Sequence, residues 1–278
     1  MKDLLSFIGM PKATYMYWQK RFDHNPEQEL EDKIKAIRAE HKDWGYRRIT
    51  GELRKSMTIN KKKVHRICKK CGLQVTSFTR KSRKYSSYKG DKGKIAPNRI
   101  HRRFDTTIPH QKITTDTTEF KYYEVDENGK MAIGKLYLDP FMDMYNREII
   151  SYGISHRPSA ESIITALKEA IKVTEDCPYR RTFHSDRGWA YQMKAYAREL
   201  KENRIYQSMS RKGNCYDNSV MENFFGVMKQ EMYYGQVYYS FDELKEAIER
   251  YIIYYNERRI KQKLGWMSPV EYRLYSAA

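Results

Sequence analysis

The pattern of apolar residues differs between two parts of this chain, and that difference constrains its fold more than any other feature. Up to about residue 71 the apolar side chains recur at intervals of three and four, as in Leu30, Ile34 and Ile37, which is the period of a helix. After residue 105 several stretches are instead rich in Thr, Ile, Tyr and Phe, as strands are, and helical patterns alternate with them. The sequence therefore predicts an all-α region followed by an α/β domain.

Three short helices are predicted in the first region. They cover residues 27–41, 46–54 and 61–71, and Asn60 is placed to cap the third helix, with Val64 on its buried side. Two short helices joined by a tight turn, the second crowded with Lys and Arg, are typical of a helix-turn-helix whose second helix enters the DNA major groove. The alternative is a three-helix bundle with a solvated basic face.

Positive charge is concentrated in the same part of the chain. Residues 1–105 carry 28 Lys and Arg against 11 Asp and Glu, whereas residues 106–278 carry 25 and 24. The formal net charge of +18 favours a polyanionic partner, and its location favours DNA binding by the first region. The candidate DNA-binding residues are Arg47, Arg48, Lys61, Lys62, Lys63, Arg66 and Lys69.

Residues 79–105 mix Lys, Arg, Ser, Tyr and Gly with almost no aliphatic run, which predicts a mobile basic linker. The chain then divides into a helical helix-turn-helix region (1–78), this linker, an α/β core (106–235) and a C-terminal helical extension (236–278).

Several classes of protein are excluded by composition. No stretch approaches the roughly 18 apolar residues of a membrane span, and no signal-peptide pattern opens the chain, so we expect a cytoplasmic protein that associates with the nucleoid when bound to DNA. Four cysteines are too few for a disulfide framework. His65, Cys68 and Cys71 do not complete a zinc site, because the other cysteines lie more than a hundred residues away.

The second region predicts a mixed sheet. Its strands are expected at residues 112–123, 135–145, 148–154, 181–185 and 204–209. An Asn-Gly turn at 128–129 joins the first two strands, whereas helices over 159–171 and 192–201 cross over to the last two. We therefore expect five strands, three antiparallel and two parallel, with helices packed on the sheet.

Three acidic residues fall where such a sheet could bring them together. Asp116 lies in the first strand, Asp186 ends the fourth, and Glu222 lies on a later helix over 219–232. Carboxylate oxygens are the ligands that Mg²⁺ prefers, and a pair of such ions can activate both the attacking and the leaving oxygen in phosphoryl transfer. Asp139 is interpreted as a strand acid without a metal role.

The setting of these acids matters more than their spacing. Thirty-five residues separate Asp186 from Glu222, but other acid pairs in the chain have the same separation. HSDRG is a strand exit, and Asn218, Glu222 and Lys229 share one polar face of the predicted helix, whose neighbouring face is apolar and expected in the core.

The end of the chain predicts one more helix, which begins at the capping box of Ser240 and Glu243 and carries an apolar stripe expected in the core. A basic cluster follows it: Arg258, Arg259, Lys261 and Lys263. This cluster either contacts DNA or is solvated.

The chain resembles the D,D(35)E transposases of bacterial insertion sequences. The matching runs are TTDTTEF, HSDRGWAYQ, CYDNSVMENFFGVMKQE and YYNERRIKQKLGWMSPVEY. The stretch GYRRITGELR with NKKKVHRICKKCGL resembles the helix-turn-helix before the integrase core in the second-frame (OrfB-type) product of the IS three family.

This resemblance implies a ribonuclease-H-like fold and metal-dependent 3′-end cleavage and strand transfer in transposition and DNA integration. It assigns Asp116, Asp186 and Glu222 to the catalytic metal ligands of Mg²⁺ or Mn²⁺, with two ions per site, and Lys229 to a DNA contact. His184 and Asn218 are candidate supporting residues, and for His184 a structural hydrogen bond is favoured over direct participation.

The resemblance further implies DNA as partner, a frameshift fusion to an upstream OrfA-type product, and a homo-oligomer on DNA. A retroviral-type integrase is disfavoured because no HHCC zinc module precedes the core. The alternative of a different class is a DNA-binding regulator with an inactive integrase-like core.

Overall fold

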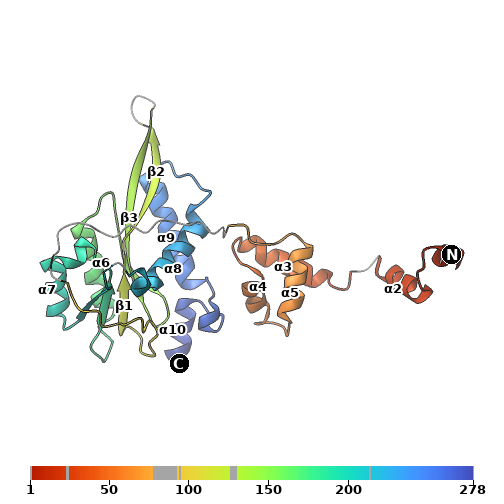
Figure 1. Cartoon of the computed structure of the whole chain (residues 1–278), viewed down its shortest axis with the longest axis horizontal. Helices are drawn as coiled ribbons and strands as arrows, with labels where there is room; N and C mark the ends of the chain where they lie inside the picture. Colours follow the sequence, from red (N-terminus) through yellow and green to blue (C-terminus); the bar gives the residue numbers. More distant parts are fainter. Residues whose placement is uncertain are drawn as a thin grey trace. The chain divides into compact units, whose positions relative to one another are not determined.

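The structure, a computed structural model, describes residues 2–22, 25–77, 93, 95–125, 130–212 and 214–277, which form two compact units (Figure 1). The first unit is Met1–Thr76 and the second is Ser77–Ala278. The predicted Asn-Gly turn at 128–129 and most of the predicted linker lie outside the described residues.

The first unit is helical, as predicted. Its helices are α1 (Lys2–Phe7), α2 (Lys12–Phe22), α3 (Gln28–Glu40), α4 (Tyr46–Leu53) and α5 (Lys61–Lys70). Ile34, Ile49 and Ile67, one from each of the last three helices, are completely buried. The Asn60 side chain accepts a hydrogen bond from the Lys62 amide at 2.8 Å, so the predicted cap of α5 is confirmed. Helices α1 and α2 have no counterpart among the predicted helices.

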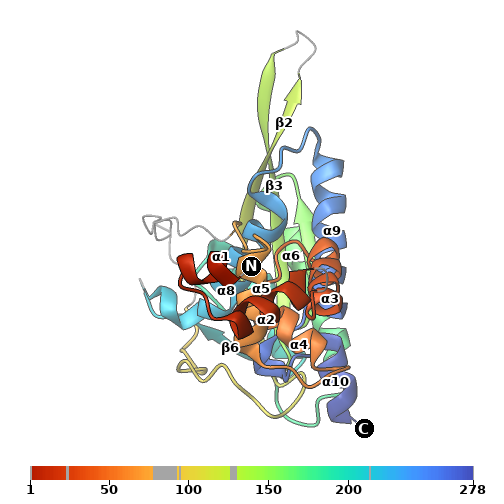
Figure 2. The same cartoon turned by 90° about the vertical axis from the view of Figure 1, so that its right-hand side faces the viewer.

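The second unit contains one mixed sheet. Its strands are β1 (Lys112–Thr115), β2 (Thr118–Val125), β3 (Met131–Asp143), β4 (Ile149–Ser155), β5 (Thr182–Ser185) and β6 (Tyr206–Met209). The long strand β3 pairs antiparallel with β1, β2 and β4, and β5 pairs parallel with both β1 and β6. Figure 2 shows that β2 and β3 extend as a hairpin beyond the rest of this unit.

Strands β1 and β2 are two segments of one interrupted strand. Thr115 lies opposite Phe141 and Thr118 lies opposite Leu138, so both strands pair with β3 in one continuous register. Only Asp116 and Thr117 separate the two segments. In this register Pro140, which has no N–H to donate, lies opposite Asp116. With β1 and β2 counted as one, the six strands correspond to the five predicted strands. The interruption of the first strand lies at Asp116, an acid predicted to bind metal.

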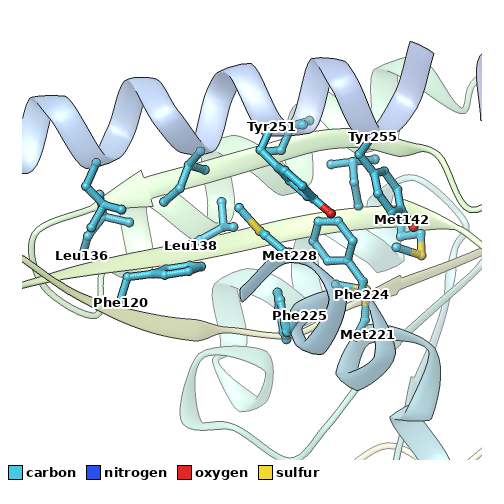
Figure 3. Packing of buried hydrophobic residues seen from close by; sticks show 14 of the residues in the cluster. Phe120, Leu136, Leu138, Met142, Met221, Phe224, Phe225, Met228, Tyr251 and Tyr255 are labelled. Atoms are coloured by element: carbon cyan, nitrogen blue, oxygen red, sulfur yellow. The ribbon is translucent and has the colours of Figure 1, made fainter. Parts of the chain in front are cut away.

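Helices cover both faces of the sheet. They are α6 (Ala160–Val173), α7 (Lys194–Glu202), α8 (Ser219–Met228), α9 (Phe241–Glu257) and α10 (Pro269–Ala277). One buried cluster joins the sheet to α6 and α7, and a second joins it to α8 and α9. In the second cluster the Phe224 ring of α8 packs edge-on against Tyr255 of α9 at 4.8 Å between centroids (Figure 3).

The predicted core faces and caps of these helices are confirmed. Met221, Phe224 and Met228 are buried, as is the apolar stripe of α9. Ser240 caps α9 by accepting a hydrogen bond from the Glu243 amide at 3.0 Å. Because α9 packs against the sheet, the predicted C-terminal extension is part of the second unit.

Residues 95–105 also pack on the second unit, although they fall within the predicted linker. Ile100 is 2% exposed, and the amide of Arg99 donates to the Ser208 hydroxyl on β6 at 2.9 Å. The buried Ile100 explains the difference, because a single apolar anchor in a basic stretch gives no periodic signal.

Candidate active site

Asp116 and Asp186 meet at the carboxyl end of two parallel strands. Asp116 directly follows β1 and Asp186 directly follows β5. In these strands Thr114 is paired with His184, so the two acids, each two residues further along, fall at the same level. Each carboxylate accepts one backbone hydrogen bond through Oδ1, Asp116 from the Thr117 amide at 2.9 Å and Asp186 from the Gly188 amide at 2.8 Å.

The surroundings oppose ionisation of both carboxyls. Burial raises the pKa of Asp186, and burial together with the negative charge of Asp186 raises the pKa of Asp116 well above its usual range. Glu222 and Asp139 add smaller contributions of the same sign to Asp116. Such a pair is stabilised when it shares a proton or binds a cation.

Glu222 lies in the first turn of α8 and is exposed. It is close enough for its charge to raise the pKa of Asp116. Among the described residues, however, no three His, Cys, Asp or Glu side chains are grouped closely enough to hold one ion. The structure therefore brings two of the three predicted ligands together and places the third on the adjacent helix.

Asn218 fastens the start of α8 to β1. Its Oδ1 accepts a hydrogen bond from the Thr114 hydroxyl at 2.7 Å, and its Nδ2 donates to the carbonyl oxygen of Thr115 at 3.2 Å. Both polar atoms of the Asn218 side chain are thus hydrogen-bonded inside the protein. Asn218 lies four residues before Glu222, and its partners on β1 directly precede Asp116.

His184 is completely buried and makes structural hydrogen bonds. Its Nε2 contacts the carbonyl oxygen of Asp217 and its Nδ1 contacts the Ser208 hydroxyl, both at 2.8 Å. Burial lowers the pKa of His184 to about 4, so the ring is neutral at pH 7. A carbonyl only accepts, so Nε2 carries the proton and Nδ1 accepts from Ser208.

Lys229 reaches back to the strand that follows Asp116. Its ammonium group donates to the Thr118 hydroxyl at 2.6 Å and to the carbonyl oxygen of Glu119 at 3.0 Å, and it lies over the Phe120 ring. These bonds attach the end of α8 to the beginning of β2, two residues after Asp116.

Two acids of the site were not predicted from the sequence. Asp139 is 1% exposed, accepts a hydrogen bond from the Thr117 hydroxyl at 2.6 Å, and has its pKa raised to about 6 by burial. Asp217 is buried beneath the start of α8 and bonded to Arg102. Asp139 interrupts an apolar strand pattern, which is a visible signal, whereas the Arg102 partner lies 115 residues from Asp217 and leaves none.

Comparison with known proteins identifies two integrase core domain matches, over residues 106–215 and 222–276, and an HTH-like domain match over 26–82. A transposase-like protein of Haemophilus influenzae is 46% identical, with 82% of this chain and 99% of that protein aligned. The InsK protein of insertion sequence element IS150 from Escherichia coli is 40% identical over 98% of this chain and 93% of its own length. The chain belongs to the insertion-sequence transposases of the IS three (IS3) family.

Among solved structures, the integrase catalytic core domain of HTLV-2, determined in complex with magnesium, is 16% identical with a TM-score of 0.42, covering 58% of the transposase and 94% of that chain. The catalytic core domain of BIV integrase gives the same identity and TM-score over 60% and 96%. The transposase has an integrase catalytic core of the ribonuclease-H-like class.

The basic residues of the HTH-like domain divide into two groups. Lys63 and Arg66 of α5 form ion pairs with Glu27 at 3.4 and 2.5 Å. Lys61, Lys62 and Lys69, by contrast, are exposed and form no salt bridge within the described part of the chain. Arg47 is exposed and Arg48 is half-buried. Family membership and this domain together indicate that the transposase binds DNA.

The C-terminal basic cluster is partly internal. Arg259 is 5% exposed and forms a two-pronged ion pair with Glu231, and Lys261 donates to the Tyr255 hydroxyl at 2.6 Å. The two predicted alternatives, DNA contact and solvation, are therefore both wrong for Arg259. No helix of the transposase, in the ranges that the structure describes, could cross a membrane.

Proposed function

We propose that the transposase catalyses metal-dependent 3′-end cleavage and strand transfer, with Asp116, Asp186 and Glu222 as ligands of Mg²⁺ or Mn²⁺, two ions per site. The observation that supports this most directly is the placement of Asp116 and Asp186 at the same level of two parallel strands.

The donor set suits a hard divalent cation. All three side chains offer carboxylate oxygens, and Oδ2 of both aspartates makes no hydrogen bond within the described part of the protein. Burial and the negative charge of Asp186 raise the pKa of Asp116, which supports a cation site here, because a bound cation would offset both effects. Bound ions supply activation of the attacking oxygen and stabilisation of the leaving oxygen.

The protein contributes orientation, and the reaction needs no nucleophilic side chain. Water attacks a phosphodiester at the element end and breaks its bond to the 3′-oxygen, which releases a 3′-hydroxyl. That hydroxyl then attacks a phosphodiester of the target, and the 3′-oxygen of the target strand leaves as the new phosphodiester bond forms. The backbone bonds from Thr117 and Gly188 hold Asp116 and Asp186, and Asn218 holds the helix that carries Glu222.

DNA is held by the HTH-like domain, and Lys229 contacts DNA beside the acids. The residues proposed to contact DNA in the first unit are Arg47, Arg48, Lys61, Lys62, Lys63, Arg66 and Lys69. The transposase acts in the cytoplasm as a homo-oligomer on DNA, fused by frameshift to an upstream OrfA-type product.

The variant Asp186→Asn tests this proposal. Labelled element-end DNA is incubated with Mg²⁺ or Mn²⁺ and with the chain, both alone and fused to the upstream product. We expect the wild type to cleave and join DNA, and Asp186→Asn to bind DNA with unchanged affinity but lose both reactions. Glu175→Gln removes an exposed carboxylate elsewhere in the second unit. It is the matched control and stays active.

Retained strand transfer in Asp186→Asn would overturn the assignment. A folded, DNA-bound wild type that cleaves in neither form would instead identify a DNA-binding regulator with an inactive core.

A further inference from the structure

The carboxylate of Asp217 is hydrogen-bonded to three other side chains of the second unit. It is completely buried and accepts five hydrogen bonds: three from Arg211 at 2.9 to 3.0 Å, one from Arg102 Nε at 2.9 Å, and one from the Asn98 side chain at 3.1 Å. The hydrogen bonds from Arg211 and Arg102 lower the pKa of Asp217, so its carboxylate is ionised at neutral pH.

The backbone at this position joins the two strands that end in acids. The carbonyl oxygen of Asp217 binds His184, two residues before Asp186, and the next side chain, Asn218, binds β1 just before Asp116. Asp217 and Asn218 thus connect both acid-bearing strands to the start of the helix that carries Glu222.

Arg102 is held in place by an unusual turn. His101 and Arg102 have φ values of 50° and 61°, which lie in the left-handed region that side-chain-bearing residues rarely adopt. The Asn98 side chain stabilises the turn by accepting a hydrogen bond from the His101 amide at 2.8 Å. Two successive residues in this region are maintained only where the surroundings select them, and here the turn directs Arg102 toward Asp217.

We propose that Arg102 and Asp217 are positioning residues for Glu222: their ion pair fixes the start of α8 against both acid-bearing strands, and thereby sets how readily Glu222 completes the metal site. This rests on the proposed function, because it presumes that Glu222 is a metal ligand. Glu222 is exposed and outside the Asp116–Asp186 pair, so its approach depends on where α8 begins.

A general stabilising role predicts something different. If the pair only stabilises the fold, its loss would lower the melting temperature without changing the metal requirement. A positioning pair changes the metal requirement at similar stability, as residues that orient metal ligands do.

Two measurements on the full chain separate these roles. The first is amide hydrogen exchange over residues 214–225 in metal-free protein. The second is the Mn²⁺ concentration that gives half-maximal strand transfer with precut 3′-hydroxyl end DNA. Arg102→Ala is compared with Arg102→Lys and with Arg103→Ala, which removes the same charge from the adjacent exposed position.

We expect Arg102→Ala to exchange faster over 214–225 and to need about tenfold more Mn²⁺, Arg102→Lys to recover part of both, and Arg103→Ala to match the wild type. Wild-type exchange and Mn²⁺ requirement in Arg102→Ala would overturn the proposal. Asn98→Ala, which removes one bond to the same carboxylate and the bond from the His101 amide that stabilises the turn, replaces Arg102→Ala if that variant does not fold. If the wild type shows no strand transfer, the proposed function fails, and the exchange measurement still tests the attachment of α8.

Discussion

Asp116 and Asp186 stand side by side at the ends of β1 and β5, on chain segments about seventy residues apart. Each has one carboxylate oxygen bonded to the backbone, and burial raises the pKa of both. The two carboxylates repel each other when both are ionised, and a bound cation removes that repulsion. The stability of the protein should therefore depend on divalent metal and on pH.

Divalent metal is expected to stabilise the folded protein through this pair. At a Mg²⁺ or Mn²⁺ concentration 100 times Kd, binding to the folded state adds about 2.7 kcal/mol, which corresponds to a rise in Tm of roughly 5–10 °C for a unit of this size. Asp186→Asn should lose this rise and, without metal, melt above the metal-free wild type, because one of two repelling charges is gone. Calorimetry with and without a chelator measures both effects, and Glu175→Gln should behave as the wild type. An Asp186→Asn protein that metal stabilises fully would contradict the metal-ligand role.

Asp139 should make the metal-free protein less stable as pH rises. Its pKa is about 6 in the folded protein and near 3.8 when unfolded, so between these values the folded state retains a proton that the unfolded chain has lost. Stability from this group is complete below about pH 4 and is lost as pH passes through 6, by up to about 3 kcal/mol. Asp139→Asn keeps an acceptor for the Thr117 hydroxyl and removes this dependence. Urea unfolding of both proteins at pH 5 and 7.5 tests it, and equal pH dependence would refute it.

Lys62 and Arg66 should contribute unequally to DNA binding, although both are exposed on α5. The Arg66 guanidinium is bonded to Glu27, whereas Lys62 forms no salt bridge with the described residues. Lys62→Ala should weaken binding and reduce the slope of log K against log salt by about 1, with a smaller change for Arg66→Ala. Fluorescence anisotropy over a salt series measures the slopes. Lys33→Ala on α3, where the lysine pairs with Glu29, is the control, and equal slopes for the two α5 variants would argue against the division.

The Arg259–Glu231 pair should be important for stability and unimportant for DNA contact. Both side chains are almost completely buried, and Tyr251 also donates to Glu231. Glu231→Gln leaves the Arg259 charge buried without its counter-ion, which costs about 3–5 kcal/mol of unfolding free energy. Arg258→Ala, at the exposed neighbouring position, should change stability by less than about 0.5 kcal/mol. Denaturant unfolding distinguishes them, and a Glu231→Gln protein of wild-type stability would show that the pair is dispensable.

Local features of this protein are determined by the sequence itself. The helical spacing in α3, α5 and α9, the caps at Asn60 and Ser240, and the change to strand composition after residue 105 all depend on residues within four positions of each other. The same holds for the position of Asp186 at a strand exit. These features were enough to predict a mixed sheet with helices packed on it and to mark the three acids as candidates, which the family resemblance then assigned to the metal site.

Contacts between distant residues were decided only by the tertiary structure. The register of β1 on β5 determines that Asp116 meets Asp186, and packing determines that Asp139 is buried beside Thr117. Arg259 lies in a basic cluster by sequence but is an internal ion-pair partner in the fold. Arg102 bonds to Asp217 across 115 residues. Burial and partner choice depend on how whole elements pack, so the sequence identified which groups carry charge, and the fold decided which of them act on one another.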